Sequence, residues 1–385
     1  PLVAAFDAEG DEVGLRRATR MGMWLSMGFA VLALPLMIWS RPIMALMGQD
    51  QALADMVDGY LFIAAWGIFP ALMVMVLKSY LAALERTQVV LWITLLAGVA
   101  NVLANYAFIF GNWGAPELGV RGAAIASVTS HSVSLVAVVI YVLWKMPQHQ
   151  MFVRLWRPDW EMLARVFRLG LPIGFTGLSE VGLFAASAVM MGWLGTVALA
   201  AHGIALQLAS ITFMVHLGIS NVATIRAGNA YGRRDPAHLA RGAITATVMS
   251  ALVAVLTIFV FVMWPEPLIN LFMQRDEPAR DQILVIGVGL LAMASLFQLV
   301  DGAQAVALGI LRGVQDTTVP MLLAGFSYWI VGMPASYLLG FVFDLEGVGV
   351  WLGLVFGLGV AAILLNARFW GSVLKRLGPT DPAAA

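Results

Sequence analysis

The 385-residue sequence has no cysteine and only 11% charged residues, and these two shortages exclude several classes of protein. Without cysteine the chain has no thiol nucleophile and no thiolate metal site, and it is not a disulfide-built secreted scaffold. A soluble domain carries about 25% charged residues, more than twice the fraction here. The 22 basic and 22 acidic side chains also cancel, so no nucleic acid or other polyanion is expected as a partner.

The sequence also lacks the short motifs of several common enzyme classes. It contains no Gly-x-x-x-x-Gly-Lys phosphate loop, no His-Glu-x-x-His metal motif and no Gly-x-Ser-x-Gly nucleophile elbow. We therefore predict no enzymatic activity, no bound cofactor and no nucleotide site. Any pumping would draw on an ion gradient or on a partner subunit.

What the sequence does contain is apolar residues, which make up 61% of the chain. A membrane-spanning helix needs about 20 mainly apolar residues. Ten segments meet this requirement, so the sequence predicts an all-α polytopic membrane protein embedded in the lipid bilayer. The predicted spans are 21–39, 59–84, 88–110, 122–144, 169–194, 197–222, 243–264, 283–310, 318–341 and 348–370.

A weak internal repeat divides these segments into two groups. Pro42-Ile43 resembles Pro267-Leu268, and Leu118-Gly119-Val120 before one segment resembles Glu346-Gly347-Val348 before another, each about 225 residues apart. Transporters are often built from two such similar halves. We therefore expect two pseudo-symmetric six-helix bundles.

The repeat also predicts how the chain is organised. Aligning the halves puts the start of the first one roughly 55–60 residues before residue 1, so we expect twelve helices in the full form, with the first and most of the second missing here. The predicted parts are an incomplete N-terminal half at 1–144, a cytoplasmic amphipathic linker at 145–168, a C-terminal half at 169–370 and a cytoplasmic tail at 371–385. Within the linker, Trp156, Trp160 and Phe167 alternate with arginines and predict a helix in the membrane interface.

The basic residues predict the orientation. When the loops are assigned alternately to the two sides of the membrane, 18 of the 22 Lys and Arg residues fall on one side. By the positive-inside rule that side is cytoplasmic, and both termini lie there. The four exceptions are Arg41, Arg121, Arg275 and Arg280. Acidic residues divide equally between the sides, except for two that lie inside spans, Glu180 and Asp301.

Glu180 and Asp301 are the leading candidates for chemistry. Glu180 lies about eleven residues into its segment, roughly 16 Å deep at 1.5 Å per residue, which is near the middle of a hydrocarbon core about 30 Å thick. A mid-membrane carboxylate costs about 2.5–3.5 kcal/mol on insertion scales, and such residues usually serve ion or proton movement. Because protonation and cation binding compete for the same oxygens, either a proton or a cation fits this pair. The alternative is a pair of neutral carboxyl groups that only join helices.

Other polar residues inside spans are candidates for lining a cavity. Gln298 and Gln304 lie three residues on either side of Asp301 and share its helix face. In the N-terminal half, Asn101, Asn105 and Tyr106 form a polar strip that could equally hold helices together. His202 is a lone histidine in a span, and a packing role is favoured over proton transfer for such a residue.

The chain resembles the MATE family (multidrug and toxic compound extrusion), most closely its NorM-like bacterial branch. The resemblance is carried by Gly170-Leu171-Pro172-Ile173 with Ser179-Glu180-Val181, by Ala200-Ala201-His202, by Asp301…Gln304 with Leu311-Arg312-Gly313, and by Asn101…Asn105-Tyr106. It implies a secondary multidrug efflux antiporter that exchanges organic, often cationic and aromatic, compounds for Na⁺ or H⁺, with Glu180 and Asp301 at the cation site. It also implies a monomer in the bacterial inner membrane.

Two other functions stay open at this point. A lipid-linked saccharide flippase of the same superfamily would need a cationic cavity, and few basic residues lie in mid-span. A membrane-embedded enzyme or scaffold subunit would explain buried carboxylates, but it is disfavoured by the internal repeat and by the lack of a nucleophile with a base.

Overall fold

The computed structural model describes residues 1–46, 51–274 and 277–377, and these residues contain helices and no strand. Among these residues, ten helical segments are long and apolar enough to cross a membrane, which confirms the predicted number. Of the sequence predictions, Arg275 and residues 378–385 of the predicted tail lie outside the described residues.

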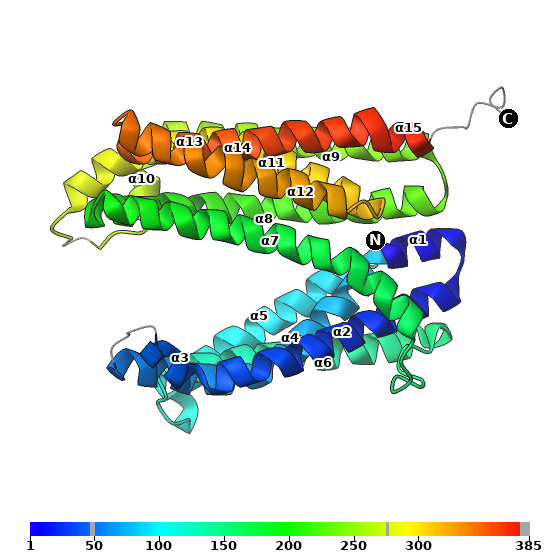
Figure 1. The fold of residues 1–385 in the computed structure, drawn as a ribbon. Coiled ribbons are helices and arrows are strands. Elements are labelled where there is room, and N and C mark those ends of the chain that lie inside the picture. The colour runs from blue at the N-terminus through cyan, green and yellow to red at the C-terminus, as the bar shows by residue number, and fades with distance from the viewer. Residues whose placement is uncertain (47–50, 275–276, 378–385) are drawn as a thin grey trace. The chain divides into compact units, whose positions relative to one another are not determined.

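The chain divides into two compact units, which we call the N-terminal bundle (2–167) and the C-terminal bundle (from 168 onward). Within each bundle the long helices run side by side (Figure 1). The N-terminal bundle contains α1 (Leu2–Glu9), α2 (Glu12–Ile38), α3 (Ser40–Leu46), α4 (Gln51–Ala83), α5 (Thr87–Phe110) and α6 (Val120–Lys145), with short 3₁₀ turns η1 (Asn112–Gly114) and η2 (Pro147–His149). In this bundle α4 packs against α2 and α6, and α6 packs against α5.

The C-terminal bundle is built around α11. Its helices are most of α7 (Trp160–Trp193), α8 (Thr196–Gly232), α9 (Pro236–Met263), α10 (Pro265–Asn270), α11 (Arg280–Gly313), α12 (Thr318–Phe326), α13 (Met333–Tyr337), α14 (Glu346–Arg368) and α15 (Leu374–Leu377). Three π-helical stretches, η3 (Ser327–Gly332), η4 (Leu338–Val342) and η5 (Phe369–Val373), adjoin α12, α13 and α14. Because α11 packs against α8, α9 and α14, its side chains are the most extensively buried.

The long helices extend past the predicted ends of the spans, in several cases by two turns or more. Helix α2 starts at Glu12 instead of 21, and α8 ends at Gly232 instead of 222. The added turns carry charged and polar residues that belong to the membrane interface. A span predicted from apolar residues ends at this boundary, although the helix itself continues beyond it. At the start of α2, Asp11 caps the helix by accepting a hydrogen bond of 2.8 Å from the Gly14 amide.

The linker differs from the prediction. Residues 151–156 form turns. The only longer helix in the linker begins at Trp160, which is the first residue of α7, so there is no separate interfacial helix. The turns are fastened to α2 by polar contacts that the apolar pattern could not reveal. Arg20 donates to the carbonyls of Gln150 and Met151, and Trp24 donates to that of Leu155.

Close helix packing depends on small residues, as is usual in membranes. A Cβ added at Gly122 of α6 would lie 2.2 Å from the Phe108 carbonyl oxygen of α5. In the C-terminal bundle, one at Gly353 of α14 would lie 2.1 Å from the Ser336 amide nitrogen of α13. Backbones therefore touch at these positions, and no residue larger than glycine fits without a shift.

Candidate functional site: a carboxylate pair joined by Gln304

The two predicted carboxylates meet inside the C-terminal bundle. Glu180 comes from α7 and Asp301 from α11, and the Gln304 side-chain amide joins them. Its Nε2 donates to Glu180 Oε1 at 3.1 Å and to Asp301 Oδ1 at 3.2 Å. The two carboxylates thus share one amide nitrogen, and neither makes an ion pair among the described contacts.

Asp301 is the more enclosed of the two. It is 2% exposed and Gln304 is 1% exposed, whereas Glu180 is half-buried. A buried carboxylate with only a neutral hydrogen-bond donor beside it is an unfavourable group, and proteins keep such groups mainly where they bind an ion or a proton.

Tyr328 completes the cluster from the opposite side of Gln304. This fully buried tyrosine lies in η3, and its hydroxyl donates to Gln304 Oε1 at 2.6 Å. Both ends of the Gln304 amide are therefore engaged, and its orientation is set. Tyr328 was not among the residues predicted from the sequence. The available signal was a tyrosine in the middle of the predicted span 318–341, because a buried hydroxyl needs a partner.

Two further side chains contribute to the surroundings of Glu180. Arg312, two turns beyond Gln304 on α11, is half-buried and interacts electrostatically with the Glu180 carboxylate and with Tyr328. Its part in the site was also missed, because in the sequence it reads as one of the cytoplasmic charges. Next to Glu180 on α7, the Ser179 hydroxyl accepts a 2.9 Å hydrogen bond from the Trp329 indole.

Gln298 and His202 are buried in the same bundle but contact other groups. Gln298 Nε2 donates to the Ala209 carbonyl of α8 at 3.1 Å, and the Trp351 indole donates to His202 Nδ1 at 3.1 Å. Gln298 Oε1 and His202 Nε2 are buried without a hydrogen-bond partner in the described part of the chain. Neither side chain has a described contact with the carboxylates.

The polar strip of α5 belongs to the N-terminal bundle. Asn105 donates to Asn101 Oδ1 at 2.9 Å, so the two amides pair along the helix. Tyr106 is 47% exposed, and its ring meets Trp113 edge-on at 5.1 Å between centroids. This strip and the carboxylate pair are two separate polar groups, one in each bundle.

The site can hold a proton or a small cation without further titratable partners. No group of three or more His, Cys, Asp or Glu side chains with metal-binding geometry occurs among the described residues. The donors available to a hard cation are carboxylate oxygens, which such ions prefer. Glu180 and Asp301 each use one oxygen to accept a hydrogen bond from Gln304, so each has a second oxygen to offer a cation.

Comparison with known proteins identifies relatives along the whole chain. The MatE family model matches residues 1–107 and 172–338. The probable multidrug resistance protein NorM of Rhizobium meliloti is 42% identical over 387 residues, covering 100% of this chain and 82% of that protein. The corresponding protein of Agrobacterium fabrum is 42% identical over 371 residues, covering 96% and 80%.

Solved structures agree on the fold. A eukaryotic MATE transporter superimposes with a TM-score of 0.85 at 18% identity, over 98% of this chain and 82% of that chain. An outward-facing multidrug resistance MATE transporter of the MOP superfamily gives 0.87 at 20% identity, over 97% and 83%. The fold with two pseudo-symmetric bundles is thereby confirmed.

Proposed function

Because this chain belongs to the MATE family, we propose that it exports small organic compounds in exchange for Na⁺ or H⁺. It is a multi-pass membrane transporter and not an enzyme. Relatives named as probable multidrug resistance proteins favour a broad substrate range. We expect cationic and aromatic compounds to be among the substrates. Their bacterial sources and the 18 basic residues predicted on one side favour the inner membrane with cytoplasmic termini. We expect it to act as a monomer without a nucleic acid partner.

The single observation that carries the coupling proposal is the Glu180–Gln304–Asp301 cluster. Two carboxylates within 3.2 Å of one neutral amide repel each other when both are charged. A proton or Na⁺ relieves that repulsion, so the site favours an occupied state. Export follows if occupied and empty sites favour different conformations, since an ion drives a change only through its different affinity for two states.

The two coupling ions make different demands on Gln304. A proton can add to the second oxygen of Glu180 or Asp301 and leave both hydrogen bonds from Nε2 in place. Na⁺ coordinated by Glu180 Oε1 and Asp301 Oδ1 would lie beside the Gln304 N–H groups, which carry positive partial charge. The amide must then turn away from Tyr328 or move. Na⁺ bound through these two oxygens therefore requires a rearrangement that a proton on the second oxygen does not.

Proteoliposomes with an imposed Na⁺ or H⁺ gradient test the proposal. Glu180→Gln and Asp301→Asn should each abolish gradient-driven efflux of a cationic aromatic dye while membrane insertion stays normal. Asp281→Asn is the matched control, because it removes an exposed carboxylate from the first turn of the same helix α11. Efflux retained in both site variants would remove these carboxylates from the mechanism. Wild-type efflux under only one gradient identifies the coupling ion, and efflux under neither argues for a flippase or scaffold role.

A further inference from the structure

The predicted spans of the N-terminal bundle contain a single Lys, Arg, Asp or Glu residue, which is Lys78 of α4. No carboxylate occurs in these spans at 21–39, 59–84, 88–110 and 122–144, whereas the spans of the C-terminal bundle contain two. Among the described residues, Lys78 forms no ion pair. An ionisable side chain within a membrane almost always faces protein or a water-filled space and usually serves a function.

The Lys78 ammonium does not reach toward the nearest end of its helix. It donates a hydrogen bond of 2.9 Å to Thr94 Oγ1 of α5. Lys78 lies five residues before the end of α4, about 8 Å, and Thr94 lies seven residues after the start of α5, about 10 Å. Because only residues 84–86 separate these two helix ends, a snorkelling lysine would extend toward that turn. Snorkelling to the membrane interface therefore does not explain this contact.

The hydrogen bonds around the ammonium leave it able to bind an anion. The Thr94 hydroxyl donates to the Val90 carbonyl at 2.7 Å, so its oxygen serves Lys78 as an acceptor. An ammonium group has three N–H donors, and the contact with Thr94 uses one of them. His131 of α6 interacts electrostatically with Lys78 and adds no negative charge. A cation with two donors to spare and no acid beside it favours a carboxylate as ligand.

Thr94 also lies at one end of an apolar pocket of about 390 Å³. The pocket continues along α5 past Leu95 and Val99 to Leu103, and its lining beyond Thr94 has no polar side chain. Gly98 keeps part of it open, because a Cβ added there would meet nothing within 4 Å. A positive charge at the end of an apolar surface suits an aromatic compound that carries a carboxylate.

We infer that Lys78 and this pocket bind aromatic compounds with a carboxylate, which the ammonium holds while the rings lie along α5 from Leu95 to Leu103. The inference rests on the proposed export of organic compounds and extends it to zwitterionic and anionic substrates. A lipid phosphate fits less well. Headgroups lie outside the hydrocarbon core, whereas the ammonium is bonded about 10 Å from the helix ends.

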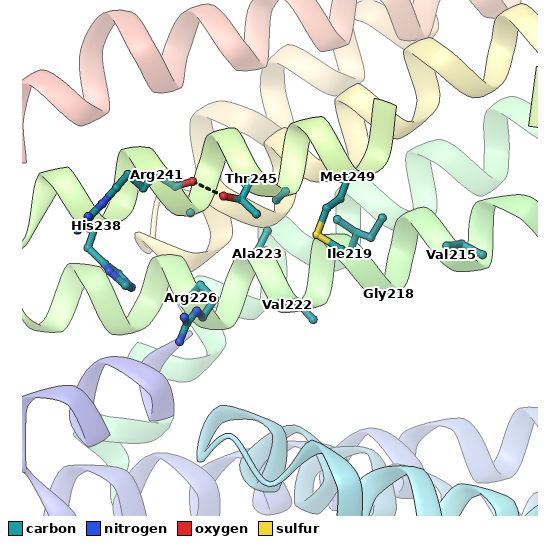
Figure 2. A pocket seen from close by; sticks show the side chains of 12 residues that line it. Val215, Gly218, Ile219, Val222, Ala223, Arg226, His238, Arg241, Thr245 and Met249 are labelled. Atoms are coloured by element: carbon teal, nitrogen blue, oxygen red, sulfur yellow. Dashed lines mark hydrogen bonds between the residues drawn. The ribbon is translucent and has the colours of Figure 1, made fainter. Parts of the chain in front are cut away.

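A second basic pocket provides a comparison. The groove of about 700 Å³ between α8 and α9 has Arg226, His238 and Arg241 toward one end, as Figure 2 shows. Arg226 already interacts with another group, so this end of the groove offers less to a new anion than Lys78 does. Arg241→Gln therefore tests whether a basic residue in any pocket would serve.

Equilibrium binding to the purified chain, followed by fluorescence polarisation, tests the assignment with a carboxyrhodamine and its methyl ester as probes. The two dyes differ only in the carboxylate, so the ratio of their dissociation constants isolates its contribution. A hydrogen-bonded charge at a half-buried site contributes about tenfold in affinity, so Lys78→Gln should weaken binding of the acid about tenfold without weakening the ester. Lys78→Arg should keep most of the preference. Thr94→Val should reduce it about threefold, because the ammonium is then no longer held in place.

Two control variants lie in the same bundle. Lys145→Gln removes its other lysine, which lies at the end of α6 over the Trp144 ring, and the ratio should stay unchanged. Gly98→Leu should weaken both dyes equally by filling the pocket. Gly28→Leu on α2, where an added Cβ also meets nothing within 4 Å, should weaken neither.

The proposal is overturned if the wild type does not bind the acid, if Lys78→Gln leaves the ratio unchanged, or if Lys145→Gln or Arg241→Gln changes it equally. Displacement of the acid by phosphatidylglycerol, in the wild type but not in Lys78→Gln, would assign the site to a lipid headgroup instead. Melting temperatures identify any variant that fails to fold, and Thr94→Val then decides, because it keeps the shape of the side chain. Binding needs no ion gradient, so a failure of ion coupling appears in efflux and a failure of this proposal in the dye ratio.

Discussion

Gln304 is the residue on which the candidate site depends, and Gln304→Leu tests this directly. The substitution keeps a side chain of similar size but removes all three hydrogen bonds of the amide. Each carboxylate then loses a donor, and the Tyr328 hydroxyl loses its acceptor at a position with 0% exposure. We expect the variant to insert normally but to lose gradient-driven efflux, because the two carboxylates are no longer held at one point.

The size of the effect on stability can be estimated from the contacts. Side-chain hydrogen bonds within membranes contribute about 0.6 and at most about 1.7 kcal/mol each, and a buried hydroxyl left without a partner costs about 1–3 kcal/mol. Gln304→Leu should therefore lower the free energy of unfolding by roughly 2–4 kcal/mol. Tyr328→Phe removes one of the same bonds from the other side and should cost about 1 kcal/mol. The double variant should cost less than the sum by about 1 kcal/mol, since it leaves no unpaired hydroxyl.

Reversible unfolding in mixed detergent micelles, followed by the tryptophan signal, measures these differences for the wild type, both single variants and the double variant. A matched control is Gln298→Leu, which removes a buried glutamine from the same helix with no described contact to Tyr328 or to the carboxylates. Its cycle with Tyr328→Phe should be additive. Additivity within about 0.3 kcal/mol in the Gln304 cycle would refute the described contact, and full efflux by Gln304→Leu would refute its role.

Two further predictions concern stability alone. The Arg17 guanidinium holds the pKa of Asp159 below its usual value, so their pairing stabilises the N-terminal bundle above about pH 4 and is lost as pH falls further. Because both side chains are partly exposed, Asp159→Asn should cost less than about 1 kcal/mol at pH 7, and its difference in melting temperature from the wild type should shrink as the pH falls below about 4. Gly353→Ala should cost about 1–3 kcal/mol by forcing α14 off Ser336, whereas Gly359→Ala, with only ordinary contact distances, should be close to neutral in the same melting assay.

The sequence predicted the spans well because their signal is a property of continuous stretches. Each of the ten segments has to bury its own backbone in lipid, so length and apolarity are visible without tertiary contacts. Helix ends were less predictable, since charged turns such as the one containing Arg17 are helical yet leave the hydrocarbon. The linker was interpreted wrongly for a related reason. Its arginine and tryptophan pattern resembled an interfacial helix, but hydrogen bonds from Arg20 and Trp24 hold residues 151–156 as turns on α2.

The candidate site was predictable only in part. Glu180 and Asp301 stand out because a carboxylate within an apolar run has no reason to be there other than an interaction. Gln304 and Gln298 have equal spacing from Asp301, and helical periodicity treats them alike. Only tertiary contacts distinguish the two glutamines: Gln304 contacts Glu180 and Tyr328, whereas Gln298 contacts the Ala209 carbonyl.

The surroundings of the cluster differ in how much movement they permit. On the side of α8, α11 has no room to slide, because a Cβ at Gly309 would lie 2.4 Å from Ser220 Oγ and one at Gly313 would lie 2.5 Å from Ala227 Cβ. The Ser220 hydroxyl also donates to the Ala305 carbonyl at 2.6 Å, which fastens the two helices next to the site.

On the other side, the partners of α11 at the site are held less closely. Glu180 is half-buried on α7, and Tyr328 lies in a π-helical stretch, a conformation frequent at functional sites because it leaves the helix less regular. A change of charge at the carboxylates alters the hydrogen bonds of Gln304, and those bonds lead to α7 and η3 rather than to α8. If an ion or proton binds at the carboxylates, we therefore expect the resulting movement in α7 and the π-helical stretch, with α8 and α11 staying together.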